Sequence, residues 1–123
     1  MDFKIELPEI PPADIKFYIN RSYFHELLKY KIIRLAYNSG YIPIPEANTS
    51  RGKLDVLWWK NNSDMVAFEI DFSYKKRSLD KLTHSLAKEK YWIIVNKKLP
   101  LKQFSGIKII KLDFNYKSST KIK

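Results

Sequence analysis

The chain has 123 residues, enough for one compact domain with a single hydrophobic core and too few for two. Cysteine is absent, which excludes disulfides, thiolate zinc sites and cysteine nucleophiles. The three glycines form no Gly-rich loop of the kind that cradles a nucleotide's phosphates. No apolar run approaches the roughly 18 to 20 residues of a membrane span, and residues 1–6 do not resemble a signal peptide. We therefore expect a soluble, cytoplasmic (intracellular) protein without a membrane partner.

The formal net charge of +10 is distributed unevenly. Residues 1–61 carry 9 Lys and Arg against 7 Asp and Glu, a balance of +2, whereas residues 62–123 carry 14 against 6, a balance of +8. A basic surface attracts an anionic polymer, because each neutralised phosphate releases condensed counterions. The charge favours nucleic acid as the partner, and a lysine-rich surface that only aids solubility is the alternative.

The first part of the chain predicts an arm followed by a helix. Three prolines break regular structure in residues 1–20, which we interpret as an extended arm with at most a short strand at 15–19. Asn20 or Ser22 can cap a helix that runs to about residue 38, before Gly40. Its apolar residues recur on one face at 3.6-residue spacing: Phe24, Leu27, Leu28, Ile32, Leu35 and Ala36.

Three strands are predicted next. Residues 41–47 are apolar but contain prolines, which suits an edge strand, and residues 48–52 are expected to be a loop. Residues 53–60 and 65–72 are predicted to form a hairpin, because the turn-rich sequence Asn-Asn-Ser-Asp separates them.

The rest of the chain predicts a helix and two strands. A basic loop leads to a helix over 79–90, capped by Ser78, whose inward residues are Leu79, Leu82 and Leu86. A continuous apolar run at 91–95 is typical of a strand buried on both faces. The final strand is expected at 106–114. The domain organisation is therefore an arm (1–20), a single domain (21–114) and a loose basic tail (115–123).

Three carboxylates lie where a strand should be apolar: Asp55, Glu69 and Asp71. An unpaired buried carboxylate is costly, so these acids need a metal ion, a cation or water. Glu69 and Asp71 are two residues apart and share one face of their strand. With His25 and His84 as the only nitrogen ligands, any metal should be bound by oxygen, as Mg²⁺ or Mn²⁺ is.

The strand register sets a condition for this cluster. In a regular hairpin that pairs Lys60 with Met65, Asp55 would oppose Ile70 and Glu69 would face away. We therefore predict an odd-length loop or a bulge that brings Asp55 level with Glu69 or Asp71.

At these residues the sequence resembles the PD-(D/E)XK nucleases, which include restriction enzymes and junction resolvases. The matching motifs are Gly-Lys-Leu-Asp55-Val on the second strand and Phe-Glu69-Ile-Asp71 on the third. A looser likeness is Phe-His25-Glu-Leu-Leu-Lys29 on the first helix, followed by Gly-Tyr-Ile-Pro-Ile-Pro-Glu46. The resemblance covers roughly residues 22–96. It implies an α/β fold with a restriction-endonuclease-like αβββαβ core, in which helices flank a mixed central sheet.

The resemblance also implies a function, that of a Mg²⁺-dependent deoxyribonuclease that hydrolyses phosphodiester bonds in DNA. Asp55 and Glu69 would hold the metal with the Ile70 carbonyl, and Asp71 is a further ligand candidate. The family usually has a lysine where this chain has Asp71. Lys81 is the first candidate to replace it, ahead of Lys75, Lys76 and Arg77. One alternative is a relative that keeps the fold and binds nucleic acid without catalysis. Another is a structural or partner-binding protein whose acids only cap a basic interface.

Several further residues are candidates for the site or for partner contacts. Glu46 can supply another catalytic carboxylate or can simply be solvated. The predicted contacts to nucleic-acid phosphates are His25, Lys29, Lys75, Lys76 and Arg77. Trp58 and Trp59 point to opposite faces, so one at most belongs to the core. A second apolar patch on the first helix, made by Tyr30, Ile33 and Tyr37, can be covered by the arm or by a second copy in a homodimer.

Overall fold

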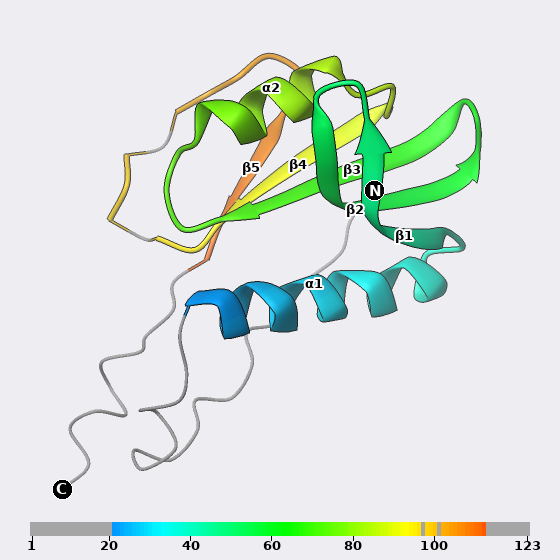
Figure 1. The fold of residues 1–123 in the computed structure, drawn as a ribbon, viewed down its shortest axis with the longest axis horizontal. Coiled ribbons are helices and arrows are strands. Elements are labelled where there is room, and N and C mark those ends of the chain that lie inside the picture. The colour runs from blue at the N-terminus through cyan, green and yellow to red at the C-terminus, as the bar shows by residue number, and fades with distance from the viewer. Residues whose placement is uncertain (1–20, 97, 101, 113–123) are drawn as a thin grey trace, which may run out of the picture.

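The computed structural model describes residues 21–96, 98–100 and 102–112. It is an α/β fold in which one helix covers each face of a five-stranded mixed sheet (Figure 1). The elements are α1 (Arg21–Asn38), β1 (Ile42–Thr49), β2 (Gly52–Asn61), β3 (Asp64–Asp71), α2 (Lys76–His84), β4 (Glu89–Ile94) and β5 (Lys108–Lys111). The predicted arm and basic tail lie outside the described residues.

The strands lie side by side in chain order, β1-β2-β3-β4-β5. β1, β2 and β3 pair antiparallel through two hairpins, whereas β4 and β5 are parallel to β3. The crossover from β3 to β4 carries α2, as a parallel connection requires. The predicted element order and the mixed sheet are therefore confirmed.

The buried face of α1 is built from Phe24, Leu28, Ile32 and Ala36, each four residues after the last. This stripe packs on the side of the sheet formed by residues such as Val56, Trp58 and Phe68. The indole nitrogen of Trp58 donates a hydrogen bond to the Ile32 carbonyl over 3.2 Å. The predicted helix and its inward face are confirmed, although Leu27 and Leu35 are only half-buried.

The second helix differs from its prediction at both ends. It starts three residues earlier than expected, at Lys76, so Ser78 lies inside the first turn instead of capping it. It ends at His84, because Ser85 is extended and the Lys88 amide already bonds to the sheet at the Met65 carbonyl. Leu82 is buried as predicted, but Leu86 lies beyond the helix and is 89% exposed, so its inward assignment was wrong.

The remaining strand boundaries shift by a few residues. The predicted loop at 48–52 is largely strand, because β1 and β2 continue to a tight turn at Ser50 and Arg51. Thr49 Oγ1 donates to the Gly52 carbonyl over 2.6 Å and accepts the Arg51 amide, and Gly52 has a φ of 122° that suits glycine. β4 is buried as predicted, and β5 is shorter than expected. None of the described helices combines the length and apolar character that crossing a bilayer requires.

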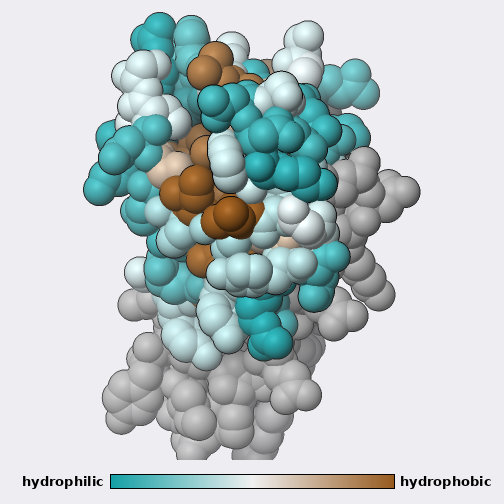
Figure 2. Space-filling model, turned by 90° about the vertical axis from the view of Figure 1, so that its right-hand side faces the viewer, coloured by the Kyte–Doolittle hydropathy of each residue, from teal (hydrophilic) through white to brown (hydrophobic). Residues whose placement is uncertain are grey.

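The edge strand β1 leaves apolar side chains on the surface. Ile42 and Ile44 are 57% and 38% exposed. Figure 2, which views the molecule from the right-hand side of Figure 1, shows a small hydrophobic group surrounded by hydrophilic residues. Pro43 and Pro45 have no backbone N–H, which limits the pairing of a further strand at this edge.

The predicted apolar patch on α1 is divided between core and surface. Ile33 packs partly against the core, whereas Tyr30 and Tyr37 are 53% and 69% exposed. Arg34 lies over the Tyr30 ring, 5.7 Å from its centroid. Cover of this surface by a second copy stays a prediction.

Candidate functional site

The register between β2 and β3 brings Asp55 level with Glu69. The turn pairs Asn61 with Asp64, but the next pair is Trp59 with Met65, so Lys60 is an extra residue on β2. This bulge shifts the register by one, and Val56 therefore lies opposite Phe68. The bulge that the site requires is present, and this prediction is confirmed.

The two carboxylates are held by each other's backbone. Glu69 Oε2 accepts the Asp55 amide over 2.7 Å, and Asp55 Oδ2 accepts the Ile70 amide over 2.7 Å. These side-chain oxygens thus accept backbone amides next to the pair Val56 and Phe68, where the backbone pairing of β2 with β3 ends. The result is a fixed pair of acids between the two helices.

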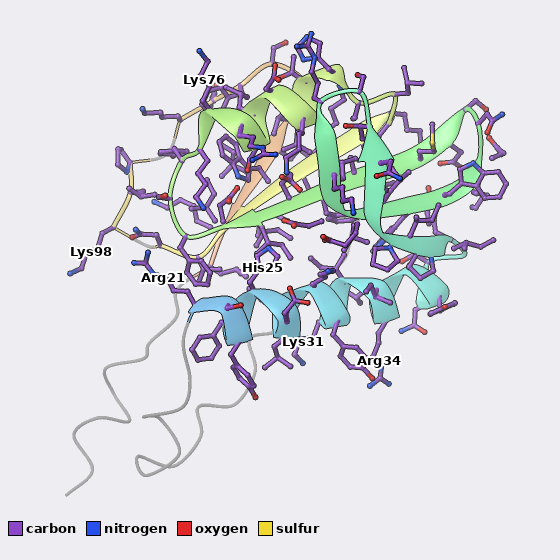
Figure 3. All side chains as sticks on the ribbon, in the orientation of Figure 1. Arg21, His25, Lys31, Arg34, Lys76 and Lys98 are labelled. Carbon is purple, nitrogen blue, oxygen red and sulfur yellow. The ribbon has the colours of Figure 1, made fainter. Side chains whose placement is uncertain are left out.

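A cation from each helix meets this pair. From α2, Lys81 Nζ lies 2.6 Å from Glu69 Oε1 and donates to the Lys53 carbonyl over 2.8 Å. From α1, His25 Nε2 lies 3.2 Å from Asp55 Oδ2, and Figure 3 shows the His25 side chain pointing from α1 toward the sheet. Each acid therefore has its own cationic partner, and the Lys81 side chain is only 13% exposed.

The proton affinities of the three titrating groups follow from these contacts. The hydrogen bond to Asp55 outweighs burial and raises the pKa of His25 to about 9, so the ring is an imidazolium at neutral pH. Burial alone would raise the pKa of Asp55, but hydrogen bonds from His25 and the Ile70 amide bring it below its ordinary value. Burial and the Asp55 charge raise the pKa of Glu69 to about 7, although Lys81 acts in the opposite direction.

Asp71 is buried in the same region with partners of its own. Its Oδ2 accepts a hydrogen bond from the Trp92 indole over 2.8 Å, and Lys75 Nζ lies 3.7 Å from its Oδ1. Among the described residues, no group of three or more acidic, histidine or cysteine side chains is arranged to hold one metal ion. Asp71 lines the same pocket as Asp55 and Glu69, and its part in metal binding stays a prediction.

A pocket of about 240 Å³ opens beside these acids. Its walls are His25 from α1, Asp55 from β2, residues 69–72 at the end of β3, and Lys75, Arg77, Ser78 and Lys81 from α2. The pocket thus joins a pair of carboxylates to several cations, a combination that suits a phosphate ligand with a metal ion.

The other predicted contacts lie outside the pocket lining. Lys29 is held by Glu46 at 3.0 Å and Glu26 at 3.6 Å, and its side chain is 13% exposed. The register of β1 places Glu46 level with Asp55, but its half-exposed carboxylate bonds to Lys29. Lys76 is exposed and points away from the domain (Figure 3).

No protein-family model matches the chain, and neither a curated protein nor a solved structure matches it.

Two residues of the pocket region were missed or misassigned from the sequence. Trp92 was expected only as part of an apolar strand, although a buried indole N–H needs an acceptor and Asp71 is one. Ser78 was assigned to a helix cap, which hid its position inside the pocket wall.

Proposed function

We propose that this protein is a Mg²⁺-dependent nuclease that hydrolyses phosphodiester bonds in DNA, with a restriction-endonuclease-like αβββαβ core. The observation that carries the proposal is the 2.6 Å contact between Lys81 and Glu69, beside Asp55 in an open pocket. The chain has an aspartate where the resembling family has its lysine, and Lys81 brings an ammonium group to the same glutamate from the following helix. The element order, from α1 through β4, supports the proposed core.

The donor set at the pocket fits a hard divalent ion. Asp55 and Glu69 supply carboxylate oxygens, and the resemblance adds the backbone carbonyl of Ile70, a residue that also lines the pocket. Mg²⁺ is commonly bound through one or two carboxylates and keeps several of its waters. When bound, such an ion supplies charge to polarise a phosphate, lowers the pKa of a water and stabilises the leaving oxygen.

The chain's own cations have separate tasks in this proposal. Lys81 is fixed by Glu69 and the Lys53 carbonyl, so its charge is already in place when a substrate phosphate arrives. The imidazolium of His25 lines the same pocket and can donate a hydrogen bond to a phosphate oxygen. Arg77 and Lys75 add positive charge at the pocket, where they offset the repulsion between a DNA strand and the acids.

A cleavage assay tests the proposal. Supercoiled, linear duplex, single-stranded and branched DNA are incubated with Mg²⁺, Mn²⁺ or a chelator, using wild type and the Asp55→Asn, Glu69→Gln and Lys81→Met variants. We expect metal-dependent cleavage of at least one DNA form and a loss of about 100-fold or more in each variant.

Asp80→Asn and Lys88→Met are the matched controls. Both residues lie outside the pocket lining, so these variants should cleave at the wild-type rate. Full activity in Glu69→Gln would refute the proposed site.

A binding protein without catalysis is the second candidate, and the surroundings of Asp71 favour it. Asp71 accepts a hydrogen bond from Trp92 and forms an ion pair with Lys75. Both oxygens of Glu69 also have partners within the chain, so a metal ion would have to compete with these contacts. Salt-sensitive DNA binding by wild type, without cleavage in any metal, is the result that supports this alternative.

A further inference from the structure

Ser78 is a buried polar residue that lines the pocket and has no side-chain hydrogen bond with the described residues. Only 4% of its surface is exposed. The Ser78 oxygen is not among the fully enclosed side-chain atoms that lack a partner, so it is accessible from the pocket although the residue as a whole is buried. The hydroxyl of Ser78 is therefore available to a ligand in the pocket.

The N-terminus of α2, where Ser78 lies, has no side-chain cap. Lys75 precedes α2 with extended backbone and makes no side-chain cap, and the first bond of the helix runs from the Leu79 amide to the Lys75 carbonyl. The amides of residues 76–78 consequently have no acceptor among the described residues. Free amides and the positive end of the helix dipole at this point attract an anion.

The charges around Ser78 also favour an anionic ligand. Arg77, Lys81 and the His25 ring bring positive charge to the pocket from two helices. Lys81 and His25 are already paired with Glu69 and Asp55, whereas Arg77 forms no ion pair with the described residues. A planar guanidinium beside a serine hydroxyl and free amides is suited to the oxygens of a phosphate group.

We propose that Ser78, Arg77 and the open first turn of α2 form a phosphate-binding subsite beside the acidic pair. The naming of its ligand as a phosphate of a nucleic-acid strand rests on the proposed nuclease function. The subsite itself rests on the Ser78 hydroxyl that lines the pocket and on the uncapped helix, and it requires no metal. It holds one phosphate of the strand while the neighbouring phosphodiester lies at Asp55 and Glu69.

Binding measured in a chelator separates this subsite from catalysis. The probes are short single strands with a 5′ phosphate, with a 3′ phosphate, or with neither, each labelled internally with a fluorophore and titrated by anisotropy. The variants are Ser78→Ala and Arg77→Ala. We expect each to weaken binding of at least one probe about tenfold, because a hydrogen bond to a charged group is lost.

The two control variants remove a serine hydroxyl and an arginine side chain that lie outside the proposed subsite. Ser85→Ala removes, at the other end of α2, a buried hydroxyl that has no hydrogen-bond partner in the described part of the chain. Arg34→Ala removes an exposed arginine that points away from the sheet (Figure 3). Both should bind every probe within about twofold of wild type. Equal thermal melting of Ser78→Ala and wild type verifies that the fold is intact.

The three probes identify the source of the phosphate. A terminal phosphate is the ligand if only one phosphorylated strand gains affinity over the unmodified strand, and if Ser78→Ala abolishes that gain. A phosphate within the strand is the ligand if Ser78→Ala weakens all three probes equally. Wild-type affinity of Ser78→Ala for every probe overturns the subsite, whatever the cleavage assay shows.

Inorganic phosphate provides a second, direct measurement. Titrated into ¹⁵N-labelled full-length protein, it should shift the amide resonances of residues 76–78 more than those at the C-terminal end of α2. Unchanged resonances at the first turn also overturn the proposal. Cleavage lost in Glu69→Gln, with probe binding kept, is the expected pattern if both proposals hold.

Discussion

The Nζ of Lys81 lies 2.6 Å from Oε1 of Glu69, and the same nitrogen donates to the backbone of β2 at Lys53. One lysine thus attaches α2 to both strands that carry the acidic pair. Because Glu69 is almost fully buried, the strength of this contact depends on whether its carboxyl group is ionised.

The Lys81→Met variant should therefore lose stability in a pH-dependent way. At pH 5.5 Glu69, with a pKa of about 7, is mostly neutral, and the variant loses little more than a hydrogen bond. At pH 8.5 the carboxylate is charged in wild type and would lack its cation in the variant, so we expect an additional loss on the order of 1 to 3 kcal/mol. Urea denaturation at the two pH values measures the difference, and the double variant with Glu69→Gln should show no such pH dependence.

His25 should make the wild type less stable as the pH rises above neutrality. Its folded-state pKa of about 9 exceeds the ordinary 6.5, so its stabilising effect is complete below pH 6.5 and disappears as pH rises through 9. The loss should be on the order of 1 to 3 kcal/mol. Denaturation curves from pH 6 to 9.5 should be flatter for His25→Gln than for wild type, and equal slopes would contradict the assigned contact with Asp55.

Metal binding should compete with the proton on Glu69. If Asp55 and Glu69 hold Mg²⁺, binding releases that proton, and the affinity should fall about tenfold per pH unit well below pH 7. The measurement is the Mg²⁺-induced rise in melting temperature at pH 6 and pH 8, which should be larger at pH 8. Glu69→Gln should show no rise at either pH, and an identical rise in this variant would place the ion elsewhere.

The hydrogen bond from Trp92 to Asp71 should contribute more to the stability of the protein than to DNA cleavage. Trp92→Phe keeps a ring in the core but leaves the Asp71 carboxylate without its 2.8 Å hydrogen bond. We expect a loss on the order of 1 to 3 kcal/mol, measured by chemical denaturation. Asp71→Asn retains an acceptor for the indole and should lose less. A loss of DNA cleavage in Trp92→Phe as large as in Glu69→Gln would instead assign Asp71 a direct role.

The helices and strands were largely predictable because their signals are local. Apolar side chains that recur every 3.6 residues identified α1, and the Asn-Asn-Ser-Asp turn located the hairpin of β2 and β3. The end of α2 was not predictable in this way. Leu86 continues the helical period, but the chain leaves the helix after His84 to bring β4 into the sheet. Tertiary pairing overrides a local preference there.

The sequence by itself determined that acids occupy apolar strands, that two of them share one face, and that a register shift is needed to align Asp55 with Glu69. Only the tertiary structure decided that Lys60 supplies this shift, that Lys81 and His25 meet the acids, and that Ser78 faces the pocket. The reason is physical. The periodicity of side chains is fixed within each helix or strand. A contact between two elements depends on how the helices pack on the sheet, and no single segment of the sequence determines that packing.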